Sequence, residues 1–388
     1  MKETIEKANT EIINVIDEFD YSTQQEPYNR RFKEWRRNKK NPYAYNFVLD
    51  KREQVFVDGQ GFLDESAAEA EGSVLGRILY IIGIALLVAV LIDIVLFRLC
   101  VMIFDALGFD IHSTFFNSVV YGGKTDVVIT LMIFTFLKLA VPSGIIQYKF
   151  RVPLKLEYPA SLGDSGELIA AIAAAMMVSV IAGIPAAYSE ETREIYYFFK
   201  TYSADMSVWD QEEFLVYTIF DVIIVSILWE MLFRGGMFVA LRQFGDFYAI
   251  IVTSVLAGLL TQNLQVMIGT MLISVVSSVG MLRSGTIFTA IAVRITYKMY
   301  LLAQTIIEMS SSEYMFIRRN IFMAAVFVVG LAVLLIVYSK GERRKRSTLA
   351  NCRTHLSAAK KMTVPFRIFP LVSVIAICLI AGLLKIIV

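Results

Sequence analysis

Histidine is almost absent from this chain of 388 residues. It occurs twice, as His112 and His355, and neither residue lies inside an apolar segment. Any mechanism that needs two histidines within apolar segments is therefore excluded. Cysteine is scarce as well, since the chain holds three scattered cysteines and no Cys-x-x-Cys pair. Neither a disulfide framework nor a zinc–thiolate site is indicated.

Polar residues are too few for a soluble domain. Hydrophobic residues make up 56% of the chain, and the mean hydropathy is +0.60, which is typical of a polytopic membrane protein. Apolar segments lie at 78–104, 127–147, 167–188, 214–236, 247–264, 266–282, 286–305, 320–338 and 366–386. Their lengths predict an all-α polytopic membrane protein, a bundle of about eight to nine transmembrane helices. The segments after residue 245 follow one another closely, which leaves room for one re-entrant segment.

Polar and apolar stretches divide the chain into four regions. They are a polar N-terminal region at 1–73 with a basic, aromatic segment and an acidic linker, first transmembrane helices at 74–206, a membrane core at 207–310, and C-terminal helices at 311–388 with a basic loop at 339–365. The strongly basic segments fall on one side of the membrane if the N-terminus is cytoplasmic. We therefore expect a multi-pass protein of the cell membrane in this orientation.

The segment from Arg30 to Lys40 interleaves aromatic and basic residues. One interpretation is a stripe that lies on anionic lipid headgroups. The other, which we favour, is an ordinary positive-inside signal for membrane topology. The bilayer is the expected surroundings of the chain, and no nucleic-acid partner is predicted.

Ionisable residues interrupt several apolar segments. Among them, Glu230 and Arg234 lie four residues apart and share one face of a helix. The others are Asp93, Arg98, Lys138, Asp221, Arg294 and Lys298. The two signs nearly balance, which favours internal ion pairs over a ladder of like charges.

The stretch from Ser226 to Tyr300 resembles the CAAX-protease and bacteriocin-processing family of intramembrane endopeptidases. Members of that family carry Glu-Glu-x-x-x-Arg-Gly on one helix, and the present chain has Trp229-Glu230-Met-Leu-Phe-Arg234-Gly235. Further matching pieces are Ala257-Gly-Leu-Leu-Thr261 followed by Gln262 and Asn263, the turn Leu282-Arg-Ser-Gly-Thr286, and Arg294-Ile-Thr-Tyr-Lys298. The resemblance implies a helical membrane core at 207–310 and a hydrolase ancestry.

The chain departs from the family at most of the positions that carry the chemistry. In the family, the first glutamate and the histidines activate a water molecule for attack on a peptide carbonyl. Those positions hold Trp229, Thr261 and Arg294 here, and Lys298 replaces the family's asparagine. Glu230 and Arg234 alone remain of the motif residues, so we expect the catalysis to be lost. One carboxylate without imidazole partners is a poor metal site, and no cofactor is predicted.

Three functions stay open at this point. The first is a catalytically degenerate protein that binds a membrane peptide, a lipid or a partner protein in the former active-site cavity. The second is an active endopeptidase with Glu230 as its base, assisted by Thr261, Gln262 or Asn263. The third is a transporter or channel component with polar residues along one route.

The role of Arg294 has two interpretations. It lies four residues before Lys298, so both side chains project from one side of their helix. Arg294 then either pairs with Glu230 inside the former active site or extends with Lys298 to the lipid headgroups.

Overall fold

The computed structural model describes residues 26–38, 41–44, 55–57, 61–63, 65–113, 120–160, 163–183, 209–309, 314–339 and 356–387. His355 and most of the predicted basic loop at 339–365 lie outside these residues. Residues 184–208, at the boundary between the first transmembrane helices and the membrane core, lie outside them as well.

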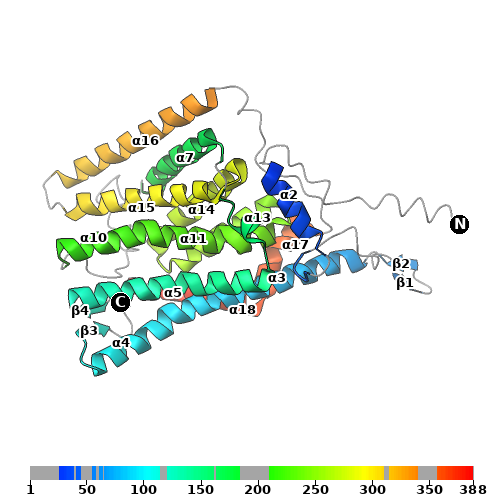
Figure 1. The fold of residues 1–388 in the computed structure, drawn as a ribbon, viewed down its shortest axis with the longest axis horizontal. Coiled ribbons are helices and arrows are strands. Elements are labelled where there is room, and N and C mark those ends of the chain that lie inside the picture. Colours follow the sequence, from blue (N-terminus) through cyan, green and yellow to red (C-terminus); the bar gives the residue numbers. More distant parts are fainter. Residues whose placement is uncertain are drawn as a thin grey trace.

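Helices dominate the described residues and lie side by side along the long axis of the molecule (Figure 1). In the first half they are α2 (Glu26–Arg36), α3 (Glu65–Leu91), η3 (Ile92–Leu96), α4 (Phe97–Ala106), α5 (Lys124–Phe150), α6 (Leu154–Glu157) and α7 (Ser165–Gly183). The second half holds α10 (Gln211–Ile219), η5 (Phe220–Val225), α11 (Ser226–Leu232), η6 (Phe233–Met237), α12 (Phe238–Arg242), α13 (Asp246–Leu260), α14 (Leu264–Ser284), α15 (Ile287–Met309), α16 (Met315–Ser339), α17 (Ala358–Thr363), η8 (Val364–Arg367) and α18 (Phe369–Ile387).

Two short antiparallel hairpins accompany the helices. Strand β1 (Val55–Val57) pairs with β2 (Gly61–Leu63), with Phe56 opposite Phe62. Strand β3 (Ile111–Ser113) pairs with β4 (Val120–Gly122), with His112 opposite Tyr121. The second hairpin joins the ends of α4 and α5 and lies opposite the end that holds α2 and α17 (Figure 1).

Six of the described helices are long and apolar enough to cross a membrane, and the count rises to seven if the bent pair at Ala358–Arg367 and Phe369–Leu383 forms one span. The chain is therefore an all-α multi-pass membrane protein, as the sequence predicts. The predicted count of eight to nine spans is not confirmed. Helix α13 has 15 residues, too few for a full span, and α15, which is not among the six, contains Arg294 and Lys298.

Small residues bring α3 and α18 close together. A Cβ atom at Gly83 would lie 2.7 Å from the backbone nitrogen of Leu371. Close approach through glycine is the usual way in which helices pack in a membrane, where water does not drive their association. The contact fixes α18 against α3 just inside the bend that separates α18 from α17.

Helix α2 packs onto the protein with the aromatic face of the basic segment. Phe32 is 0% exposed and Trp35 is 3% exposed, and both belong to the main hydrophobic core. The guanidinium of Arg242 lies 4.6 Å from the centre of the Phe32 ring, a cation–π contact. The interpretation of this segment as a headgroup stripe is therefore wrong for its aromatic side chains, although Arg30 and Arg37 are exposed.

Arg242 connects α2 to the membrane core. Its Nε donates to Asp246 Oδ1 at 2.8 Å, and its Nη2 donates to Asn29 Oδ1 at 3.2 Å. Both charged side chains of the Arg242–Asp246 pair are fully buried. The polar N-terminal region therefore contains a helix that is part of the folded core.

Candidate functional site

The helix that carries Glu230 is interrupted by two π-helical turns, η5 and η6. Gly235 lies inside η6 with φ −74° and ψ −128°, so the helix is kinked one residue after Arg234. Single π-turns are found often at functional sites, because the extra residue leaves backbone groups free for other contacts.

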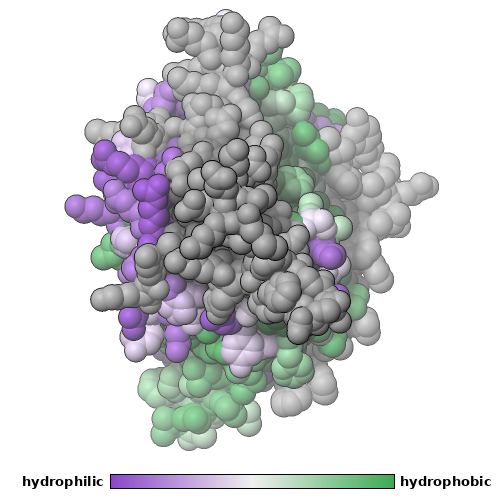
Figure 2. All heavy atoms as spheres, turned by 90° about the vertical axis from the view of Figure 1, so that its right-hand side faces the viewer, coloured by the Kyte–Doolittle hydropathy of each residue, from purple (hydrophilic) through white to green (hydrophobic). Residues whose placement is uncertain are grey.

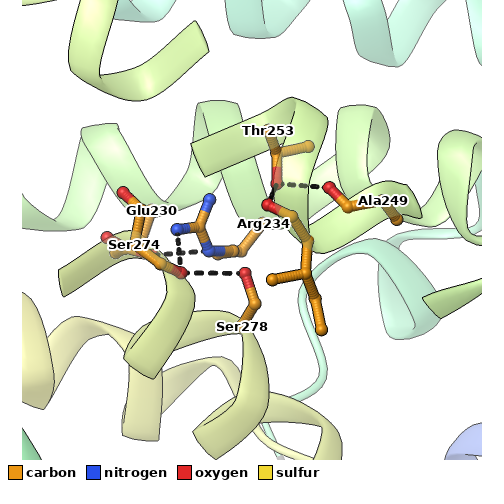
Figure 3. A network of polar contacts seen from close by, with 7 residues as sticks. Glu230, Arg234, Ala249, Thr253, Ser274 and Ser278 are labelled. Atoms are coloured by element: carbon orange, nitrogen blue, oxygen red, sulfur yellow. Dashed lines mark hydrogen bonds and ion pairs between the residues drawn. The ribbon is translucent and has the colours of Figure 1, made fainter. Parts of the chain in front are cut away.

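Glu230 and Arg234 form a fully buried ion pair. Arg234 Nε lies 3.5 Å from Glu230 Oε2, and both side chains are 0% exposed. Arg234 Nη2 also donates to the carbonyl oxygen of Ser274 on α14 at 2.6 Å. Figure 3 shows Arg234 pointing to the Ser274 carbonyl, which also accepts a hydrogen bond from Ser278. The arginine therefore joins the motif helix to the helix that follows α13.

Buried hydroxyl groups are common in the helices around this pair. Ser278 Oγ donates to the Ser274 carbonyl at 2.9 Å, and Thr253 Oγ1 donates to the Ala249 carbonyl at 2.7 Å (Figure 3). Further hydroxyls have no hydrogen-bond partner within the described residues: Ser226, Ser254, Thr270, Ser274, Ser277 and Thr289. Serine and threonine are common where membrane helices pack closely, because their side chains are small and can hydrogen-bond across the contact.

Trp229 and Arg294, two of the predicted site residues, contact each other. The Arg294 guanidinium lies 4.4 Å from the centre of the Trp229 ring, well within cation–π range. Arg294 is 3% exposed, so the prediction that it extends to the headgroups is wrong. Among the described residues, the ion pair of Glu230 is with Arg234, and no direct ion pair joins Glu230 to Arg294. Arg294 is nevertheless close enough for its charge to act on Glu230.

Lys298 pairs with Asp221. Its Nζ donates to both carboxylate oxygens of Asp221 at 2.8 Å. A second intramembrane pair joins Lys138 to Asp93 at 2.7 Å. The predicted internal pairing of these charges is confirmed, and each aspartate lies in a π-helical turn, η5 or η3.

Thr261, Gln262 and Asn263 form the turn between α13 and α14. Gln262 has a φ of 50°, the left-handed conformation. The Thr261 hydroxyl lies 2.6 Å from the Gly258 carbonyl oxygen and 3.4 Å from that of Asn263, so both of its contacts stay within the turn. These contacts give Thr261 a structural role at the end of α13. They do not direct its hydroxyl to Glu230.

Comparison with protein families identifies this part of the chain. Residues 211–300 match the family model described as Type II CAAX prenyl endopeptidase Rce1-like. Residues 211–300 are a Rce1-like domain. The domain runs from α10 into α15 and contains Glu230, Arg234, Arg294 and Lys298. The comparisons with curated proteins and with solved structures give no match.

Glu157 contacts the Rce1-like domain from outside it. Its Oε1 accepts hydrogen bonds from the Gly236 N–H and from the Tyr158 hydroxyl, both at 3.1 Å. A Cβ at Gly235 would lie 2.7 Å from Tyr158 Cε1, and one at Gly236 would lie 2.9 Å from Glu157 Oε1. The two glycines of the motif therefore make room for α6. Sequence reasoning missed Glu157, whose only signal is an acid close to the basic residues Lys149, Arg151 and Lys155.

Burial raises the pKa of Glu157 to about 7. Because the folded protein then holds this proton more tightly than the unfolded chain, the free energy of unfolding falls as the pH rises from about 4.5 to about 7, by up to about 3 kcal/mol. Glu157→Gln should remove this loss while it keeps an acceptor for Gly236. Melting temperatures in detergent from pH 5 to pH 8 test the expectation, with the exposed Glu69→Gln as the control that follows the wild type. Parallel curves for Glu157→Gln and wild type would contradict it.

Metal ligands do not gather in the domain. Among the described residues, no group of three or more histidine, cysteine, aspartate or glutamate side chains could hold a metal ion. His112 is at the far hairpin, where its Nδ1 lies 3.1 Å from Asp105 Oδ1.

Proposed function

We propose that this chain is a catalytically degenerate relative of the CAAX-type endopeptidases, which acts by binding a membrane peptide, a lipid or a partner protein. The contact between Trp229 and Arg294 carries the proposal. These residues hold the positions at which the family has a glutamate and a histidine, and they stack at 4.4 Å. An indole and a guanidinium supply neither a general base nor a route for its proton.

The surroundings of Glu230 support the same conclusion. A carboxylate that activates water needs access to that water and a group that orients it. Glu230 is 0% exposed and is held by Arg234. Asp93 and Asp221 are each closed in their own ion pairs with lysine, an arrangement that does not favour a transport route.

New protein termini in membranes distinguish binding from proteolysis. Membranes that contain the wild type or Glu230→Gln, at equal levels of inserted protein, should give the same set of termini. Cleavage products that disappear with Glu230→Gln would overturn the proposed loss of catalysis.

Copurification tests the binding role in the same membranes. A bound peptide, lipid or protein should copurify with the wild type and be lost with Arg294→Met. The exposed Arg318→Gln is the matched charge control and should retain it.

We place the protein in the cell membrane with its N-terminal end in the cytoplasm. Basic segments gather at one end, where Arg31 of α2 donates to the Lys155 carbonyl and Lys361 of α17 donates to the Phe244 carbonyl. Figure 2 looks onto this end and shows hydrophilic residues on it, with hydrophobic residues along its lower edge. Positive charge is enriched on the cytoplasmic side of membrane proteins.

Cysteine labelling tests this orientation. In a cysteine-free background, a membrane-impermeant maleimide added to intact cells should label Asp110→Cys, at the far hairpin, and not Arg37→Cys on α2. Both positions are exposed. Permeabilised cells should show labelling of both variants. Labelling of Arg37→Cys alone in intact cells would reverse the orientation.

A further inference from the structure

A groove of about 400 Å³ opens where α3 and α18 enter the membrane. Arg77 is the last charged residue of α3 before an apolar stretch that continues to Asp93. Arg367 is likewise the last charged residue before the apolar part of α18. The groove therefore lies at the depth where headgroups give way to acyl chains.

The lining of the groove changes from polar to apolar along its length. Arg77, Ser73 and Tyr80 come from the middle turns of α3, and Tyr43 comes from the N-terminal region. Ile81, one turn after Arg77 in α3, and Ile368, which directly precedes α18, supply apolar walls. A charged group above an apolar wall matches the chemistry of a phospholipid, which has a phosphate at the interface and chains below it.

The bend before α18 lies beside this groove, since Ile368 at the bend is one of its lining residues. Segments Ala358–Arg367 and Phe369–Leu383 meet at 78°, so α17 and η8 run across the bundle axis while α18 runs along it. Phe366 and Phe369 beside the bend are 70% and 81% exposed, as expected of aromatic side chains that anchor a helix in the interface. At Gly76, a Cβ would be 3.6 Å from the Ile368 side chain, so the absence of a larger side chain there widens the groove.

Charge decides which phospholipid fits. Arg77 is exposed and has no ion pair with any described residue, and none of the described residues that line the groove is acidic. Tyr80 is 49% exposed beside it, so a hydroxyl donor accompanies the guanidinium. We propose that this groove binds an anionic phospholipid of the bilayer, with its phosphate on Arg77 and an acyl chain along Ile81 and Ile368.

Tyr43 connects the groove to the Rce1-like domain. Its carbonyl oxygen accepts a hydrogen bond from Gln243 Nε2 at 2.8 Å, and its ring packs edge-on against Phe150 with the centroids 5.2 Å apart. Gln243 follows Arg242, the residue that holds α2. A lipid in the groove would therefore contact a residue that is fixed on the domain.

Native mass spectrometry of the full-length protein in detergent tests the site. Dioleoyl phosphatidylglycerol and dioleoyl phosphatidylcholine have the same chains and differ in charge. The wild type should bind the anionic lipid about fivefold more tightly, the effect of one basic residue at the interface. Arg77→Gln should remove this preference, and Arg318→Gln should keep it. Gly76→Leu, which fills the groove without a change of charge, should weaken both lipids.

Three results would overturn the proposal. They are equal affinities of the wild type for the two lipids, an unchanged preference in Arg77→Gln, and displacement of the lipid by glycerol phosphate at equal concentration. The last result would mean that the groove binds a free phosphate and makes no use of its apolar wall. Melting temperatures equal to that of the wild type establish that each variant is folded.

Discussion

Arg234→Met is expected to lower the free energy of unfolding by about 3–5 kcal/mol, because it leaves the buried Glu230 carboxylate without its partner. The two side chains are 0% exposed, and their closest atoms are 3.5 Å apart. The loss should also free the Ser274 carbonyl, which accepts from Arg234 at 2.6 Å, and so loosen α14 from the motif helix. Unfolding curves in detergent measure the effect.

The double variant Glu230→Gln/Arg234→Met separates the charge from the packing. It removes both charges, so it should be more stable than Arg234→Met alone by about 1–3 kcal/mol. If the double variant were as unstable as Arg234→Met, the arginine would act mainly through its contact with α14. If Arg234→Met were as stable as the wild type, the buried pair would have no structural role.

Gly236→Ala is expected to lower the free energy of unfolding by about as much as Arg234→Met. A Cβ at this position would lie 2.8 Å from Ile146 Cγ2 and 2.9 Å from Glu157 Oε1. Overpacking of this kind costs about 1–3 kcal/mol, and loss of the hydrogen bond from the Gly236 N–H to a carboxylate adds about 1.5–3 kcal/mol. A total of about 3–5 kcal/mol should appear in the same unfolding curves.

Gly144→Ala is the matched control for this substitution. Gly144 lies in α5, and a Cβ there would meet no atom within 4 Å. Alanine favours a helix over glycine by about 1 kcal/mol, so this variant should be as stable as the wild type or slightly more so. Equal stability of Gly236→Ala and Gly144→Ala would show that α6 does not hold the kink.

The sequence predicted the features that depend on composition and on short motifs. The apolar segments predicted the helical membrane fold. The near balance of charges predicted internal ion pairs without naming the partners, and the pairs Asp93–Lys138 and Asp221–Lys298 confirm it. The Glu-x-x-x-Arg-Gly piece and the later Arg-Ser-Gly-Thr turn predicted the family, and the match over residues 211–300 confirmed it.

Contacts between distant segments were beyond sequence reasoning. Arg294 was expected to pair with Glu230 or to reach the headgroups. Its contact with the Trp229 ring was not predicted, because no sequence pattern indicates that an arginine will stack on a tryptophan 65 positions earlier. Glu157 was missed because its partner is a backbone N–H, which every residue except proline offers. That N–H is available only because η6 breaks the regular helical hydrogen bonds, a detail of backbone geometry.

The docking of α2 has a consequence for how the protein is made. Asn29 meets Arg242 across 213 residues of chain, so α2 leaves the ribosome long before the residues that hold it. At about 5–20 residues per second the interval is roughly 10–40 s. During that time Phe32 lacks its cation–π contact with Arg242. Of the described helices, α2 is therefore the first to be synthesised, yet its contacts are complete only after Arg242 of the Rce1-like domain has been made.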